Sequence, residues 1–232
     1  MPALLIFPTV FEASAFFKMA GSRPALGAVA EVSSHGKRVF GMVSGCGCAA
    51  SLERVRGAAG SLGPDFAVLC GFCGACLPGI PAGALIFESA NADLAGALES
   101  AGASPGRIAC SDSVAGPAEK AAFARAGYSA VDMESSLFGP VFGEGRFASF
   151  RAVSDVADSD VPAGFFAATM DPETGGARFP AATLAKMFLK NPGLPFRLAR
   201  FASAAAAAKR VYDAAIPRLA EKTAQISLQW KA

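Results

Sequence analysis

Histidine, tryptophan and tyrosine are nearly absent from this chain of 232 residues, which has one His, one Trp and two Tyr. A single imidazole excludes multi-histidine metal sites and any reaction that needs two imidazoles. Charged residues are also few, at 17%, whereas hydrophobic residues make up 53%. The chain is therefore too apolar to be disordered, and its length fits one α/β domain with a large core better than two. We expect a single domain over residues 1–232.

The chain also lacks the marks of a secreted or membrane-spanning protein. Its first residues have no basic flank and include Pro8, so they do not resemble a signal peptide. Residues 66–87 carry no charge, but four Gly and two Pro interrupt them. This predicts a buried strand, a glycine-rich loop and a second strand rather than a membrane span. Six cysteines without a secretory signal indicate reduced thiols and a cytoplasmic protein.

Acidic residues are scarce at the C-terminal end. Residues 183–232 hold nine Lys/Arg and two acidic residues, a net charge of +7, whereas the preceding part carries −5. A basic helical segment such as 181–232 can lie on an anionic membrane surface or meet an acidic partner; the alternative is a solvated helix packed on the domain. Before it, a segment at 158–176, rich in Pro, Gly and acids, predicts a mobile loop.

Strand-like and helical segments alternate along the chain. Strands are expected at 3–7, 26–33, 38–44, 66–70, 84–87, 107–110 and 147–153, and helices at 49–62, 92–101, 118–126 and 133–142. Such alternation predicts an α/β fold with a central mixed, mainly parallel sheet that is flanked by helices on both faces. Ligands of such folds bind at the carboxyl ends of the strands.

Carboxylates follow several of these strands in otherwise apolar surroundings. Glu12 follows the first strand, Asp132 and Glu134 stand at the start of a helix, and Asp155 follows the last strand. Burial and mutual repulsion raise the pKa of at least one carboxyl group in such a cluster, and a general acid at neutral pH needs a raised pKa. The alternative is that Asp132 and Asp155 merely cap helices.

Five motifs in this order resemble the nucleoside phosphorylase/nucleosidase superfamily, most of all its methylthioadenosine/S-adenosylhomocysteine nucleosidases. The motifs are Phe7–Glu12, Ser44–Gly47, Gly71–Gly83, Val131–Ser136 and Phe150–Asp158. The resemblance implies the three-layer phosphorylase/hydrolase-like fold, a homo-oligomer, and cleavage of the N-ribosidic bond of a purine-type nucleoside. It implies no cofactor, no metal and no nucleic-acid partner.

The resemblance also assigns roles to residues. Asp155 would protonate the departing base, with Ser154 beside it. Glu134 would bind the ribose hydroxyls and stabilise the cationic sugar, against which Met133 packs. Glu12 would hold and deprotonate the attacking water. Two negative groups that flank a developing positive charge, and a third that donates a proton, suit this reaction physically.

The sequence indicates the nucleophile and the base pocket less clearly than it indicates the acids. Backbone amides at Gly45 and Gly47 could hold phosphate, but residues 1–17 contain no basic side chain, so hydrolysis is favoured over phosphorolysis. In the base pocket, Phe72 stands where the family has a small residue, and Val114 where it has an aromatic one. The basic tail resembles that of hopanoid-associated phosphorylases, which remove adenine from a lipid-linked nucleoside, and futalosine hydrolases are another similar branch.

Three rival interpretations stay open. Residues 45–50 match the G-x-G-x-x-A dinucleotide fingerprint, although the acid about twenty residues on, Asp65, precedes its strand. Cys70, Cys73 and Cys76 have C-x-x-C-x-x-C spacing and could hold an iron–sulfur cluster or zinc; alternatively they are small apolar fillers. The chain could also be a non-catalytic nucleoside-binding member of the superfamily.

Overall fold

The computed structural model describes residues 2–159, 165 and 181–226. Within them, nine strands form one mixed sheet of order β2-β3-β1-β4-β9-β5-β6, with β8 paired to β4 and β7 to β8. The strands are β1 Ala3–Phe7, β2 Val29–Ser34, β3 Lys37–Val43, β4 Phe66–Ala75, β5 Leu85–Ser89, β6 Ser104–Pro105, β7 Ile108–Cys110, β8 Ala130–Asp132 and β9 Phe147–Asp155. β3, β1, β4 and β9 are parallel neighbours, so the expected mainly parallel sheet is confirmed.

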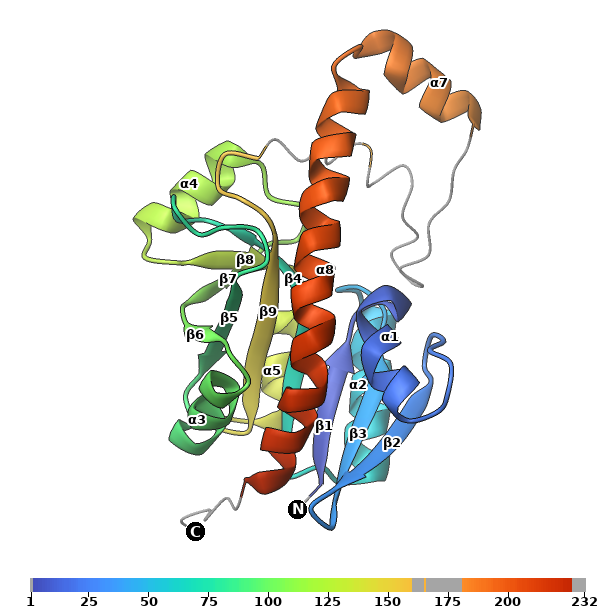
Figure 1. The fold of residues 1–232 in the computed structure, drawn as a ribbon, viewed down its shortest axis with the longest axis vertical. Coiled ribbons are helices and arrows are strands. Elements are labelled where there is room, and N and C mark those ends of the chain that lie inside the picture. The colour runs from blue at the N-terminus through green and yellow to red at the C-terminus, as the bar shows by residue number, and fades with distance from the viewer. Residues whose placement is uncertain (1, 160–164, 166–180, 227–232) are drawn as a thin grey trace.

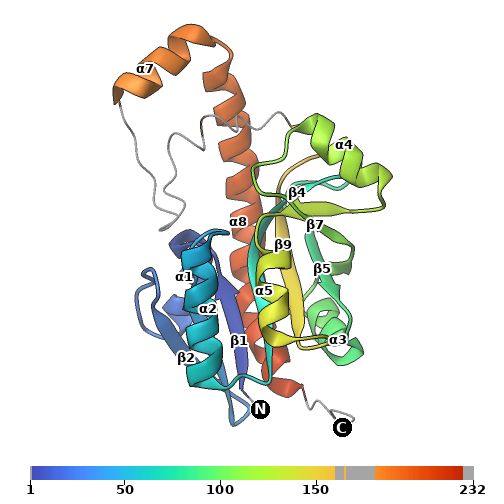
Figure 2. The same cartoon turned by 180° about the vertical axis from the view of Figure 1, so that it is seen from behind.

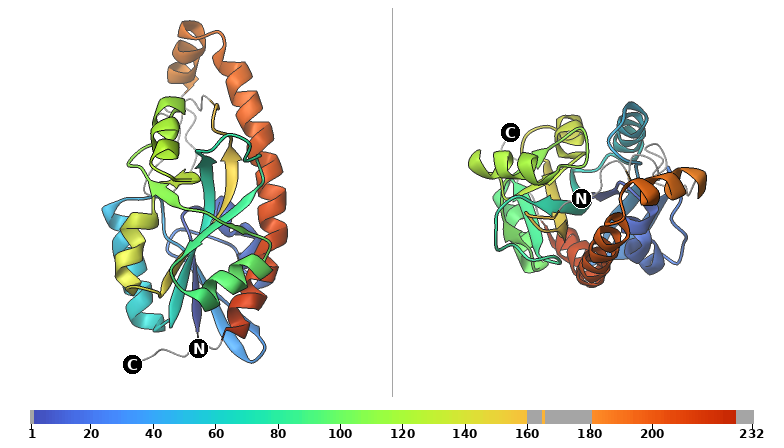
Figure 3. Two further views of the ribbon diagram at one scale, coloured as in Figure 1. Left: turned by 90° about the vertical axis from the view of Figure 1, so that its left-hand side faces the viewer. Right: turned by 90° about the horizontal axis from the view of Figure 1, so that it is seen from above.

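Helices cover both faces of this sheet. They are α1 Val10–Met19, α2 Ala49–Leu62, α3 Ala92–Ser100, α4 Pro117–Arg125, α5 Ser135–Phe142, α7 Ala181–Lys190 and α8 Leu194–Gln225. α1, α3 and α8 lie on one face (Figure 1), and α2 and α5 lie on the other (Figure 2). Seen edge-on in Figure 3, the sheet stands between these two layers, which confirms the three-layer architecture.

The all-apolar strand β1 shows why both faces must be covered. Successive side chains of a strand point to opposite faces. Leu5 and Phe7 join the core beneath α1, α3 and α8, whereas Leu4 and Ile6 join the core beneath α2 and α5. All four side chains are fully buried, so β1 forms the middle of the molecule and leads directly into α1.

The prediction of a glycine-rich loop over Gly71–Gly83 is wrong for the first half of that range. β4 continues through Gly71 and Gly74 to Ala75, because both of its edges are paired there: Gly74 lies opposite Val131 of β8 and opposite Asp155 of β9. Pairing of the backbone on two sides outweighs the preference of glycine for turns. Only the residues after Ala75 form the loop that leads to β5.

The C-terminal helix α8 has two unlike halves. From Tyr212 to Ala224 its apolar side chains are buried against the sheet and α3, whereas its beginning projects past the body and carries α7 at its far end (Figure 1). The interpretation of a helix packed on the domain is therefore correct for the second half alone. No helix in the described ranges is long and apolar enough to cross a bilayer. The loop expected at 158–176 lies, apart from residues 158, 159 and 165, outside the described residues.

Candidate active site

The first predicted catalytic residue, Glu12, is buried and held at the start of α1. Its Oε2 accepts hydrogen bonds from the backbone N–H (2.8 Å) and the hydroxyl (2.7 Å) of Thr9, and its own N–H donates to the Thr9 hydroxyl. This reciprocal capping box fixes the side chain. Oε1 accepts from the backbone N–H of Phe72 on β4, at 2.9 Å. Burial raises the pKa of Glu12, although the nearby Arg151 opposes the shift.

A fully buried arginine on β9, Arg151, binds two of the carboxylates that the sequence placed in one cluster. Its Nε and Nη2 donate to Asp132 Oδ2 at 2.9 and 2.5 Å, and Nη2 donates to Glu134 Oε2 at 3.1 Å. Its Nη1 has no hydrogen-bond partner among the described residues. A Cβ at Gly71 would overlap the Glu12 carboxylate and lie 2.5 Å from this Nη1, so only glycine lets both groups meet over β4. Sequence reasoning missed this role, and the available signal was one arginine inside an apolar strand.

Asp132 and Glu134 lie at the junction of β8 and α5, which begins at Ser135 rather than at Met133. Asp132 Oδ1 accepts from the backbone N–H (3.1 Å) and the hydroxyl (2.7 Å) of Ser135, the first residue of α5. The N-cap position belongs to Glu134, so the interpretation of Asp132 as merely a helix cap is wrong. The other oxygen of Asp132 binds Arg151. Burial raises the pKa of Glu134 to about 7; Arg151 opposes this shift and Asp132 adds to it.

The loop expected to hold an anion lies against the second carboxylate. The backbone N–H of Gly47 donates to Glu134 Oε1 at 3.3 Å, and a Cβ at Gly47 would overlap the carbonyl oxygen of the half-buried Met133. Gly45 is buried two residues beyond the end of β3. Because the Gly47 amide is already engaged by a carboxylate, this loop favours neither phosphate nor a dinucleotide.

Asp155 occupies the carboxyl end of β9 and does not cap a helix, so that alternative is wrong for it. Pairing along β4 passes from Cys73–Val153 directly to Gly74–Asp155, which leaves Ser154 as a bulge. From there the Ser154 hydroxyl donates to Asp155 Oδ1 at 2.8 Å. Bulges next to functional sites commonly redirect a side chain in this way.

The second oxygen of Asp155 is paired with a buried lysine. The Lys120 ammonium, on α4, contacts Asp155 Oδ2 and donates to the carbonyl of Val156 at 3.0 Å. Lys120 is 1% exposed. Sequence reasoning missed it, because nothing in the composition of α4 distinguishes a buried lysine from the solvated ones around it.

The two predicted base-pocket residues lie on different elements. The half-buried Phe72 ring stands 5.9 Å from that of Phe11 and 5.2 Å from that of Tyr212, between centroids. Phe72 is thus part of an aromatic cluster beside Glu12. Val114 is half-buried in the loop between β7 and α4, the helix that carries Lys120.

The structure disfavours two of the three rival interpretations, the cysteine metal site and the dinucleotide fingerprint. Cys70, Cys73 and Cys76 all lie in or beside β4, where positions three apart face opposite sides of a strand. Burial raises the pKa of each thiol, to about 11 for Cys76, whereas metal binding needs thiolates. Among the described residues, no group of three His, Cys, Asp or Glu could hold a metal ion. The Asp65 amide donates to the carbonyl of Pro2, where the central strands β1 and β4 begin. Gly47 follows the other end of the strands, so the two parts of the dinucleotide pattern are separated.

A cavity of about 370 Å³ lies elsewhere, between β5, β7, α4 and α5, and Glu88, Cys110, Tyr128 and Ser149 are among the residues that line it. None of the predicted site residues lines this cavity. The Glu88 carboxylate accepts from the backbone N–H of Ile108 at 2.7 Å, which gives it a structural role. The cluster around Arg151 and Asp155 therefore remains the candidate active site.

No protein-family model and no curated protein matches the chain. Solved structures do. A methylthioadenosine/S-adenosylhomocysteine nucleosidase from Neisseria meningitidis, in complex with methylthio-immucillin-A, is 16% identical with a TM-score of 0.68 and covers 95% of this chain and 98% of its own. The corresponding Colwellia psychrerythraea nucleosidase, in complex with adenine, is 15% identical with a TM-score of 0.66 over 99% and 98% of the two chains.

A futalosine hydrolase from Helicobacter pylori is also similar, at 16% identity and a TM-score of 0.58, and covers 72% of this chain and 93% of its own. Likenesses at such low identity show the fold. The chain shares the three-layer α/β fold of these nucleosidases and of this hydrolase, as its motifs predicted.

Proposed function

We propose that this chain is an enzyme that cleaves the N-ribosidic bond of a purine-type nucleoside with water. The observation that carries the proposal is the cluster at the carboxyl ends of the strands. Buried Glu12 and Glu134 stand beside the buried Arg151, and buried Asp155 lies four residues further along β9. Structures of the same fold hold methylthio-immucillin-A or adenine, which supports a nucleoside as the ligand.

On the sugar side, Glu12 and Arg151 can hold the attacking water between them. The unpartnered Nη1 of Arg151 donates to the water oxygen, and the Glu12 carboxylate accepts its proton as the water attacks the anomeric carbon. The raised pKa makes Glu12 a stronger base than an exposed glutamate. Glu134 accepts hydrogen bonds from the ribose hydroxyls and stabilises the cationic sugar.

On the base side, Asp155 delivers a proton to the departing purine nitrogen. Ser154 and Lys120 each hold one carboxylate oxygen, so the acid is positioned before substrate binds. Asp155 takes up a proton from solvent and passes it to the base as the N-ribosidic bond breaks, while the Lys120 ammonium holds the carboxylate in place. The proton that Asp155 takes up balances the one that Glu12 releases.

Phosphorolysis is less well supported by this geometry. Arg151 is surrounded by three carboxylates, Glu12, Asp132 and Glu134. One cation among three acids repels phosphate, and the Gly47 amide is already engaged by Glu134. We therefore retain water as the nucleophile.

Base release from a nucleoside panel, with and without phosphate, tests the proposal. The panel contains methylthioadenosine, S-adenosylhomocysteine, adenosine, inosine, futalosine and an adenosyl-lipid analogue. We expect free base and free sugar in both conditions. Phosphate-dependent formation of ribose 1-phosphate would show a phosphorylase, and binding of a substrate analogue without any turnover would show a non-catalytic binding protein.

We also propose that the enzyme is a homo-oligomer, which is the usual assembly of the superfamily it resembles. Light scattering of the full chain in solution measures its mass directly. A mass of one chain at all concentrations would contradict this expectation without affecting the proposed chemistry.

A further inference from the structure

The part of the chain that projects from the body carries uncovered apolar side chains. We call residues 186–200, from the end of α7 to the first turns of α8, the arm. Phe188, Leu189 and Phe196 in the arm are 38%, 83% and 77% exposed. Figure 3 shows the arm extending beyond the sheet and the other helices. Three large apolar groups are therefore exposed within nine residues.

Exposed apolar residues elsewhere do not gather in this way. Among the described residues, the other large ones are Phe11, Met19, Val29, Leu77 and Val211, which lie on several different elements. Single exposed apolar side chains are ordinary, whereas a cluster marks an interaction surface. The second half of α8 buries the same kinds of side chain, so the exposure of the arm is not a property of the whole helix.

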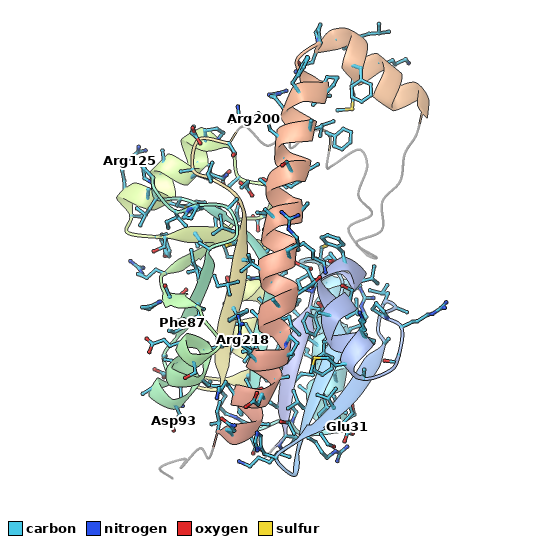
Figure 4. The ribbon with its side chains drawn as sticks, viewed as in Figure 1. Glu31, Phe87, Asp93, Arg125, Arg200 and Arg218 are labelled. Atoms are coloured by element: carbon cyan, nitrogen blue, oxygen red, sulfur yellow. The ribbon has the colours of Figure 1, made fainter. Side chains whose placement is uncertain are left out.

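The charge of the arm identifies the partner. The arm contains four Lys/Arg and no Asp or Glu. Lys186, Lys190 and Arg200 are exposed, and Arg200 can be seen on the projecting part of α8 in Figure 4. Basic residues interleaved with Phe and Leu on a helix are typical of segments that lie at the interface of an anionic membrane.

The rest of the chain strengthens this choice of partner. The arm carries a net charge of +4 and the rest of the chain −2, so an anionic lipid surface repels the body and attracts the arm. The arm also projects from the end of the molecule toward which the parallel strands β1 and β9 run (Figure 1). It can therefore reach a flat surface while the acidic body stays clear of it.

We propose that the arm docks on the surface of an anionic lipid bilayer. Phe188, Leu189 and Phe196 enter the boundary between headgroups and acyl chains, and the exposed basic side chains contact the lipid phosphates. This docking is independent of the reaction proposed for the candidate active site.

Vesicle co-sedimentation of the full chain tests the proposal. We expect binding to vesicles of phosphatidylcholine mixed with phosphatidylglycerol, weak binding to phosphatidylcholine alone, and loss of binding at high salt. The double substitution Leu189→Gln with Lys190→Gln removes one apolar and one basic group. We expect it to weaken binding on the order of 100-fold.

A matched control lies on the body, where Lys18 and Met19 form another adjacent pair of exposed basic and apolar residues on α1. Lys18→Gln with Met19→Gln should bind vesicles as the unmodified chain does, and circular dichroism should show both variants folded. Equal binding by the arm variant and the control, or binding that ignores phosphatidylglycerol, would overturn the proposal. If vesicles do not bind and the arm variant lowers the mass measured by light scattering, the arm is an interface between copies of the chain.

Discussion

The molecule uses charge in two opposite ways, in the candidate active site and in the arm. In the site, Arg151 and Glu134 are 0% and 6% exposed and bind each other directly. In the arm, Lys190 is exposed and stands next to Leu189, which is 83% exposed. Burial fixes the geometry of a charged group and shifts its pKa, which chemistry requires. Exposure leaves a charge free to meet a surface of opposite sign, which docking requires.

One helix connects these two regions. The first turns of α8 belong to the arm, and Tyr212 in its second half places its ring 5.2 Å from that of Phe72, whose backbone holds Glu12. The Tyr212 hydroxyl is buried and has no hydrogen-bond partner among the described residues. Anchoring of α8 at the site therefore determines where the arm emerges.

The strongest test of the difference between buried and exposed charge is Asp155→Asn. Asparagine keeps the shape but cannot donate the carboxyl proton, so we expect base release to fall roughly 1,000-fold. Asp158, three residues further on, is exposed and serves as the matched control. Asp158→Asn should leave the rate within about twofold, on the expectation that a solvated side chain outside the site contributes little. Near-normal turnover by Asp155→Asn would remove its role as the acid.

Glu12→Gln tests the base in the same way. The amide keeps an oxygen for the capping contacts but cannot take a proton from water, so kcat should fall by about 100-fold or more. Binding of a nucleoside analogue, measured by calorimetry, should change little. Glu31→Gln is the exposed control, since Glu31 only pairs with Arg38 on the surface. An unchanged kcat for Glu12→Gln would assign activation of the nucleophile to another group.

Lys120→Met should have a smaller effect on rate and a large one on stability. Removing one partner of a buried ion pair leaves Asp155 uncompensated, which costs about 3–5 kcal/mol of unfolding free energy. Without the ammonium that positions its carboxylate, Asp155 should work about 10- to 100-fold more slowly, and the pH dependence of kcat should change.

Two comparisons separate positioning by Lys120 from a general loss of stability. Arg125→Met, at the exposed end of the same helix, should alter neither rate nor stability. The double variant Lys120→Met with Asp155→Asn should be more stable than Lys120→Met alone, because no unpaired buried charge is left. A pH profile identical to that of the unmodified enzyme would show that Lys120 is only structural.

Elements with strong local signals could be predicted from the sequence. The helix at 49–62 and the strand at 3–7 have the predicted ends, because apolar periodicity and strand composition agree with what each segment buries. The continuation of β4 through Gly71 and Gly74 could not be predicted, since β8 and β9, distant in sequence, supply the pairing.

The acids of the candidate active site could be selected from the sequence, whereas its two buried cations could not. Acids that follow strands form a pattern, so Glu12, Glu134 and Asp155 could be selected from the sequence. Arg151 and Lys120 find their carboxylate partners 19 and 35 residues away, and a sequence does not show which cation is buried. Desolvation, the largest cause of the raised pKa values, is likewise a property of the folded chain alone.

As pH rises, activity should increase while stability decreases, because both depend on the buried carboxyl group of Glu134. In the proposed reaction Glu134 must be ionised to stabilise the cationic sugar, and its pKa is raised to about 7. We therefore expect kcat/KM to fall about tenfold per pH unit below that value. The folded state binds the Glu134 proton more tightly than the unfolded state, whose glutamate has an ordinary pKa of 4.5. Stability should consequently decline as pH rises from 4.5 to about 7, while activity increases.

Thermal melting and initial rates, measured over the same buffers, check both slopes. Glu134→Gln should flatten the change in stability over this window and lose most of its activity at every pH. Vesicle binding by the arm, which contains no carboxylate and no histidine, should change little across this pH range. An acid limb of activity that survives in the residual turnover of Glu134→Gln would assign that limb to Glu12, whose pKa burial also raises.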